Sequence, residues 1–314
     1  MKDEFSPKES VHSSLLALCA PIGIALIVAI VAAIFSIDTQ NTTLTIVVNI
    51  LTEISFLLVA YLICKKNDIK FASATKINVK PQKKFVGFAI LLGAVCLILF
   101  NPIISLWEEL LNAIGYSVQA ELPYSLSNVW VVLFAIVCVG ALPAICEETL
   151  FRGTVQNGTK EFGYKSIIYA AVLFSLMHQN LQQLPYTFIL GIVSGILLYY
   201  SRSIWPSIIF HFVNNALVIL FMALPTLSDV VFSWWIATSS LSLSLLWQII
   251  ISLICVLLAC LIIYFMIKFF EKQPNEQPKS ECKTKLFASK LMIVPIVVGI
   301  ALLLISTLSK FGVL

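Results

Sequence analysis

Charge is what this sequence has least of. Asp, Glu, Lys and Arg make up only 11% of its 314 residues, whereas soluble globular domains carry about 25%. Hydrophobic residues reach 60% and the mean hydropathy is +0.98, which indicates an integral membrane protein. The alternating period and long polar loops of an outer-membrane barrel are also missing. We therefore predict an all-α, polytopic transmembrane helical bundle.

Three further absences narrow the possible functions. The eight cysteines lie mostly inside apolar runs without paired spacing, so they predict neither a disulfide framework nor a cysteine-type zinc module. No internal repeat is evident, although many transporters are built from inverted repeats. No feature of the charge pattern indicates nucleic-acid binding, so we expect the lipid bilayer and a peptide or protein substrate as the partners.

Apolar runs near the roughly 20 residues that cross a bilayer predict eight to nine spans. The fifth and sixth runs are short, so we expect those helices to be tilted, buried centrally or extended into flanking residues. The last run follows a linker rich in Pro, Gln and Lys, which leaves its place in the core open. The candidate spans are Ser14–Phe35, Leu44–Cys64, Phe85–Leu106, Trp130–Gly158, Ser166–Gln179, Tyr186–Tyr200, Pro206–Leu224, Leu245–Phe270 and Leu291–Leu308.

The distribution of lysine predicts the orientation of the bundle. The loop 65–84 carries seven lysines and one aspartate, and basic loops stay in the cytoplasm. Segment 107–128 and the loop starting at Pro225 have no basic residue, so we place them outside, and we place the linker 271–285 inside. With nine spans this map puts the N-terminus in the cytoplasm and the C-terminus outside. The first apolar run is too long for a signal peptide and is expected to remain in the mature protein.

Few polar residues fall at membrane depth. An ionisable side chain there costs roughly 2.5–3.5 kcal/mol, so each one is a candidate functional residue. The ionisable group comprises Glu53, Glu147, Glu148, Arg152, His178 and His211, with Asn101, Asn214 and Asn215 as polar companions.

Helical geometry separates the two adjacent glutamates in the stretch CEETLFRG. Glu148 and Arg152 are four residues apart with the acid first, the favourable order for an ion pair. Glu147 is rotated by about 100° from Glu148, which leaves its carboxylate available for chemistry. Pro143 has no amide hydrogen for the Val139 carbonyl, so it either opens the helix to water beside Glu147 or serves as an ordinary packing kink.

Two later runs carry the other polar residues. FSLMH places Phe174 and His178 on one helical face, and HFVNN places His211 and Asn215 on one face. Each pair alone could be an interfacial or interhelical hydrogen-bonding pair. Counting roughly 1.5 Å per residue along straight helices puts Glu147, His211 and Asn215 at overlapping depths in the cytoplasmic half. The same count leaves the depth of His178 open.

The motifs EETLFR, FSLMH and HFVNN, in this order, resemble the CPBP (ABI) family of intramembrane proteases, which is related to the type II CAAX prenyl proteases. The resemblance covers about residues 130–224, and no motif residue departs from the pattern. It implies three regions: residues 1–127 with the first transmembrane helices and the Lys-rich loop, residues 128–224 as the CPBP/ABI catalytic core, and residues 225–314 with the C-terminal helices and the cytoplasmic linker.

The resemblance implies a peptide hydrolase and a role for each motif residue. Glu147 would activate water as the general base, with His178 helping to hold and polarise it. His211 and Asn215 would donate hydrogen bonds to the developing oxyanion, while Glu148 and Arg152 would support the site. A carboxylate in a partly apolar cavity suits general-base catalysis, and amide and imidazole donors suit an oxyanion.

The motif residues are compatible with either a metal-free or a zinc-dependent mechanism. The roles above need no metal, and this is the reading that we favour. The alternative is a zinc-dependent peptidase in which Glu147, His178 and His211 hold the ion, although their spacing is not that of an HExxH zinc motif. No basic residue lies three or four positions from Cys146 to activate a thiol, so we assign this cysteine no catalytic role.

Other function classes remain as alternatives. Buried Glu and His would also serve a transporter or proton relay, and a non-catalytic immunity or binding protein could keep the same motifs. Short loops and a Lys- and Ile-rich composition indicate a multi-pass protein of a bacterial cell membrane. Family substrates include prenylated CAAX proteins and unprenylated bacterial peptides, and some members resemble bacteriocin-immunity proteins. Because bacteria generally lack protein prenylation, we expect a membrane-associated peptide or protein without a prenyl group.

Overall fold

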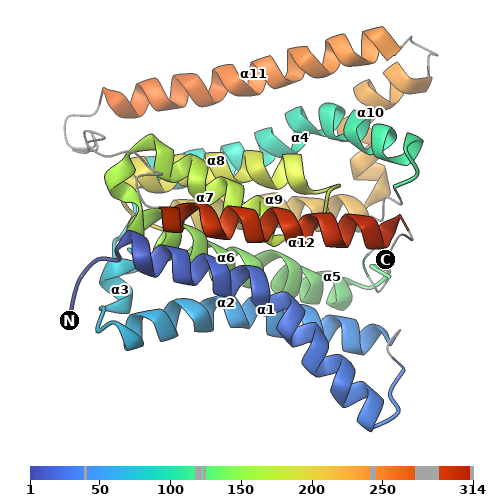
Figure 1. Cartoon of the computed structure of the whole chain (residues 1–314). Coiled ribbons are helices and arrows are strands. Elements are labelled where there is room, and N and C mark those ends of the chain that lie inside the picture. Colours follow the sequence, from blue (N-terminus) through green and yellow to red (C-terminus); the bar gives the residue numbers. More distant parts are fainter. Residues whose placement is uncertain (39–40, 117–121, 123–124, 241–244, 273–289, 312–314) are drawn as a thin grey trace.

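The chain is a bundle of roughly aligned helices (Figure 1) in a computed structural model that describes residues 1–38, 41–116, 122, 125–240, 245–272 and 290–311. Within these residues eight helices are long and apolar enough to cross a membrane. This confirms the predicted all-α, multi-pass class. The eight are Pro7–Ile34 (α1), Thr42–Lys66 (α2), Lys83–Ala113 (α4), Val129–Gln156, Leu184–Ser201 (α8), Trp205–Ala223 (α9), Leu245–Glu271 (α11) and Leu291–Lys310.

The fourth and the last of these spans change helix type along their length. Short helices lie between several of the spans. The fourth span alternates between α- and π-helical turns on both sides of the two adjacent glutamates. Its parts are α5 (Val129–Ala135), η1 (Ile136–Ala141), α6 (Leu142–Leu150) and η2 (Phe151–Gln156), where η1 and η2 are π-helical. The remaining short elements are α3 (Phe71–Ala74), η3 (Lys160–Phe162) and η4 (Lys290–Ile293), and η4 leads into α12 (Val294–Lys310).

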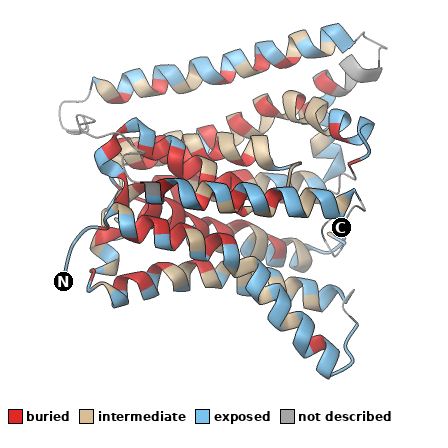
Figure 2. Ribbon diagram, in the orientation of Figure 1, coloured by how far each residue is buried: buried red, intermediate tan, exposed pale blue. Residues whose placement is uncertain are grey.

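The fifth predicted span is a short helix in the centre of the bundle. It forms α7 (Tyr164–Met177), whose 14 residues extend only about 21 Å at 1.5 Å per residue, less than the thickness of the bilayer core. Most of its side chains are buried (Figure 2), and it packs against α8, α12 and η2. Its apolar character all around the helix matches this central position.

The last span belongs to the bundle core, a point that the sequence left open. α12 packs against α1 and α7, and Leu303 lies in the same buried cluster as Leu18 and Phe174. Gly299 of α12 allows close approach, because a Cβ there would lie 2.9 Å from the Leu176 Cβ. By contrast α11 lies at the edge of the bundle (Figure 1), where it packs against α4.

The two ends of the chain lie at opposite ends of the bundle (Figure 1). The Lys2 amide donates to the Asp68 carbonyl at 2.7 Å, and the Lys70 amide donates to the Lys2 carbonyl at 2.8 Å. The N-terminus and the Lys-rich loop therefore share one end, as the nine-span map requires. The placement of the N-terminus in the cytoplasm stays a prediction.

Two boundaries differ from those expected. The segment that begins at Pro225 was expected to be a loop, but it forms α10 (Pro225–Ser240). Proline is favoured in the first turn of a helix, and Phe232 packs edge-on against Phe221 of α9 with ring centroids 5.3 Å apart. α1 begins at Pro7, before the apolar run, because Ser6 and Glu9 form a capping box. Most of the linker 271–285 and part of segment 107–128 lie outside the described residues.

Close packing of α7 on α8 depends on Gly191, because a Cβ at this position would lie 2.8 Å from the Ala171 Cβ and 2.9 Å from its Cα. We expect Gly191→Ala to lower the free energy of unfolding in detergent by about 1–3 kcal/mol. Gly23→Ala in α1 is the matched control, since nothing lies within 4 Å of its added methyl group. Equal stability of the two variants in denaturant titrations would contradict this tight contact.

Candidate active site

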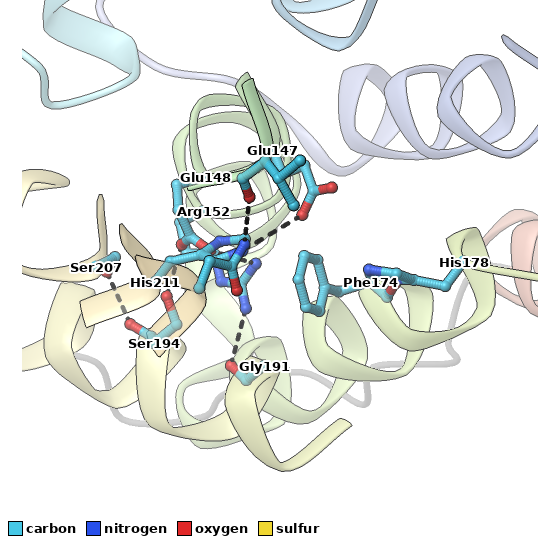
Figure 3. Close-up of polar contacts among 11 residues, drawn as sticks. Glu147, Glu148, Arg152, Phe174, His178, Gly191, Ser194, Ser207 and His211 are labelled. Atoms are coloured by element: carbon cyan, nitrogen blue, oxygen red, sulfur yellow. Dashed lines mark hydrogen bonds and ion pairs between the residues drawn. The ribbon is translucent and has the colours of Figure 1, made fainter. Parts of the chain in front are cut away.

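The two adjacent glutamates lie in the middle of the protein on α6. This helix packs between α2 and α9, and the Glu147 and Glu148 residues are only 5% and 1% exposed. Figure 3 shows that their side chains leave the helix in different directions, as the rotation of about 100° per residue requires. The site is therefore built around two buried carboxyl groups with separate surroundings.

The Glu148 carboxylate is held by groups from three helical segments (Figure 3). Its Oε1 lies 3.1 Å from Arg152 Nη1 and 3.0 Å from His211 Nδ1, and its Oε2 accepts a hydrogen bond of 2.6 Å from the Ser194 hydroxyl. The predicted ion pair with Arg152 is thus present, and His211 and Ser194 add to it. A buried carboxylate is stable only with such partners, so Glu148 fixes α8 and α9 against the fourth span.

Arg152 is fully buried and makes two further contacts besides its ion pair. Nη2 donates to the Gly191 carbonyl at 3.3 Å, and the guanidinium carbon lies 4.3 Å from the centroid of the Phe174 ring. The second contact has the geometry of a cation–π interaction. Arg152 therefore links the ion pair to α7, the helix that leads to His178.

The His211 ring lies between the two glutamates. Nδ1 is bonded to the Glu148 carboxylate, which only accepts hydrogen bonds, so Nδ1 carries a hydrogen. Nε2 then points toward Glu147, whose Oε2 is 3.9 Å away. Among the described residues, no backbone or side-chain donor is hydrogen-bonded to the buried Glu147 Oε2. Glu148 therefore sets the orientation of His211, and the other ring nitrogen faces the Glu147 carboxylate.

Phe174 connects the two histidines. Its ring meets the rings of His178 and His211 edge-on, with centroid distances of 5.0 Å and 5.9 Å. His178 caps the end of α7 and its Nδ1 lies 2.9 Å from the Phe174 carbonyl oxygen. His178 thus lies at the edge of the same cluster (Figure 3), close enough to the other motif residues to share their site. No hydrogen bond joins it to Glu147 in the described structure.

Asn215 is engaged with the backbone of the irregular fourth span. Its Nδ2 donates to the Val139 carbonyl at 3.0 Å, the carbonyl for which Pro143 offers no amide hydrogen. Asn215 therefore compensates for the proline, and its second amide hydrogen is left for another acceptor. The neighbouring Asn214 donates instead to the Gly93 carbonyl and the Tyr186 hydroxyl, contacts that join α9 to α4 and α8.

The residues of the zinc alternative do not fit a zinc ion in this arrangement. Zinc needs its ligand atoms about 2.0–2.2 Å from the metal, and the Phe174 ring packs against both His178 and His211. Among the residues that the structure describes, no three His, Cys, Asp or Glu side chains are grouped in a way that could hold a metal ion.

Two polar residues of the cluster lie outside the three motifs. Ser194 lies in the α8 run GIVSGIL, where Gly191, Ser194 and Gly195 place small residues along one face. Small residues in a membrane helix indicate close contacts between helices. This pattern could have identified Ser194 from the sequence. Glu53 of α2 was counted among the membrane-depth acids without a role. Its carboxyl group lies within hydrogen-bonding reach of the Glu147 carboxyl group.

Fold and site together define a multi-pass membrane protein with a buried glutamate–histidine–arginine cluster, as expected of a membrane protease. Residues 128–217 match the family described as Type II CAAX prenyl endopeptidase Rce1-like, and over these residues the chain carries a domain of this peptidase (CPBP) family. The matched segment includes all residues of the three motifs. Comparison with curated proteins and with solved structures found no match.

The two glutamates should differ sharply in their effect on stability. Glu148→Ala leaves the Arg152 charge buried without its counter-ion, so we expect the free energy of unfolding to fall by about 3–5 kcal/mol. Glu147→Ala is the matched control and should cost at least about 2 kcal/mol less, because the ion pair of Arg152 with Glu148 remains. Denaturant titration in detergent measures both, and similar losses for the two variants would contradict the separate roles.

A double-mutant cycle tests the contact between Asn215 and the Val139 carbonyl. Asn215→Leu leaves this carbonyl without its donor, which we expect to cost about 1–3 kcal/mol of stability. In a Pro143→Ala background the new amide can supply the missing hydrogen, so the same substitution should cost less by at least about 0.5 kcal/mol. Equal costs in both backgrounds would show that Asn215 does not compensate for the proline.

Proposed function

We propose that the protein is an intramembrane endopeptidase in which Glu147 activates the attacking water. The observation that carries this proposal is the buried Glu147 carboxylate, whose Oε2 lacks a donor and lies 3.9 Å from His211 Nε2 inside the segment that matches a peptidase family. A carboxylate with a free oxygen is able to accept a proton from water. Glu147 takes that proton while the water oxygen bonds to the substrate carbonyl carbon, and then passes it to the leaving nitrogen as the peptide bond breaks.

The oxyanion is assigned to His211 and Asn215. The contact of His211 Nδ1 with the Glu148 carboxylate supports this role, because it fixes the ring with Nε2 turned toward Glu147, where the water attacks. Asn215 has a second amide hydrogen beyond the one bonded to Val139. Donors fixed in advance stabilise an oxyanion most effectively, and the Glu148 carboxylate and the Val139 carbonyl hold these two side chains in place.

His178 is assigned to hold the water on the other side of Phe174 from His211. Its position supports the role, since Nδ1 is occupied by the Phe174 carbonyl at 2.9 Å and Nε2 is the nitrogen left for a water molecule. The Phe174 ring packs edge-on against both histidines and separates them.

The substrate is proposed to be a membrane-associated peptide or protein, with the catalytic core at residues 128–224 and the membrane that of a bacterial cell. The depth of Glu147 supports such a substrate, because a soluble protein could not bring its backbone to a carboxylate that is 5% exposed within the bundle.

Cleavage of a quenched peptide library by the detergent-purified protein tests the proposal. We expect Glu147→Ala and His178→Ala each to lower kcat by about 10²–10⁴-fold, the range for losing a proton-transfer group. Glu109→Ala is the matched control, because this glutamate is exposed on α4. Cleavage that survives both active-site substitutions would refute the assignment.

A chelator titration in the same assay separates the two water-activating mechanisms. If Glu147 activates free water, cleavage should persist after chelation and the purified protein should hold less than stoichiometric zinc. Loss of cleavage on chelation, with recovery on adding zinc, would support the metal alternative instead.

A further inference from the structure

We propose that Glu53 of α2 shares one proton with Glu147 and acts as the positioning residue for this base. The inference rests on the proposed function of Glu147, but Glu53 itself lies outside the family-matched residues 128–217. Its role comes from the packing of α2 against α6.

The first observation is the contact between the two carboxyl groups, which lie within hydrogen-bonding reach of each other. The Oε2 atoms of Glu53 and Glu147 are both buried, and neither has a donor elsewhere in the described protein. Two ionised carboxylates in contact would repel each other and leave both oxygens without a donor. One proton between them satisfies both, because a protonated carboxyl group donates to the carboxylate opposite.

The second observation is the balance of charge around Glu147. The titratable groups that face it are Glu53, Glu148, Arg152 and His211, with the Cys146 thiol beside both Glu53 and Glu147. The Arg152 guanidinium is paired with the Glu148 carboxylate, and the His211 ring faces Glu147. A third negative charge on Glu53 would be buried without a partner, which is strongly unfavourable. Glu53 is therefore the group that carries the proton.

The shared proton orients the base. The Glu53 hydroxyl donates to the Glu147 carboxylate and holds its plane. Because a carboxylate has about four acceptor sites, Glu147 can still take a proton from water. During attack Glu147 takes the proton of water, and the proton on Glu53 stays in place. Glu53 does not touch the reacting atoms and acts only through Glu147.

Infrared spectroscopy of the detergent-purified protein tests the proton without any substrate. We expect the carbonyl stretch of a protonated carboxyl group at neutral pH in the wild type and its loss in Glu53→Gln. The exposed Glu109→Gln is the matched control and should leave the band unchanged. A band that persists in Glu53→Gln would overturn the proposal.

Peptide cleavage tests the positioning role. Glu53→Gln keeps an N–H donor toward Glu147, so kcat should stay within about threefold of the wild type. Glu53→Leu keeps the side-chain volume but removes the donor, so kcat should fall by about tenfold to a hundredfold with little change in KM, the effect of one charge-assisted hydrogen bond. Equal kcat values in the two variants would overturn the positioning role. If the wild type cleaves no peptide, the proposed function fails, while the infrared result still decides where the proton lies.

Discussion

The site depends on how the Glu148 carboxylate is satisfied within an apolar bundle. A buried charge is tolerated only when its partners are in place, and removing one partner costs more than the pair contributes. Glu148 receives Arg152 from its own span, Ser194 from α8 and His211 from α9. Because these contacts converge on one carboxylate, the three segments cannot shift independently. The direction of Glu147, one residue earlier, is set by the same constraint.

Irregular backbone provides the rest of the geometry. π-Helical turns lie on both sides of α6, and such turns often occur at functional sites. Pro143 removes a backbone donor in the first turn of α6, and the hydrocarbon core of a bilayer supplies no donor to replace it. Asn215 supplies the missing hydrogen from α9. The proline and the asparagine therefore act together: one deforms the helix beside Glu147, and the other joins the deformed segment to the helix that carries His211.

The helical bundle and the ion pair of the site could be predicted from the sequence, because both depend on composition and on the spacing of residues along a helix. The scarcity of charge predicted the membrane bundle, and the spacing of Glu148 and Arg152 predicted their ion pair. The depth of His178 could not be predicted, since α7 is shorter than a membrane span and its position is set by packing against α8 and α12. The helix at Pro225 was missed because its polar residues resemble a loop, whereas the contact of Phe232 with Phe221 depends on tertiary structure. Ser194 was missed for the same reason, because a small polar residue gains meaning only when the opposite helix is known.

The contact partner of Glu53 is the feature of the site that its neighbours in the sequence predict least. On α2 Glu53 is an isolated acid in an apolar run. No neighbouring residue in the sequence explains why an ionisable side chain, which is unfavourable at membrane depth, is present there. Its partner is Glu147, on a helix that comes two spans later in the chain. A second carboxyl group beside Glu147 is unfavourable if both are ionised, but with one proton it becomes a donor to the Glu147 carboxylate. The family-matched segment contains the proposed base Glu147 and the Glu148–Arg152 ion pair, whereas Glu53 comes from the N-terminal helices. It follows that the chemistry of residues 128–217 depends on the packing of a helix outside them.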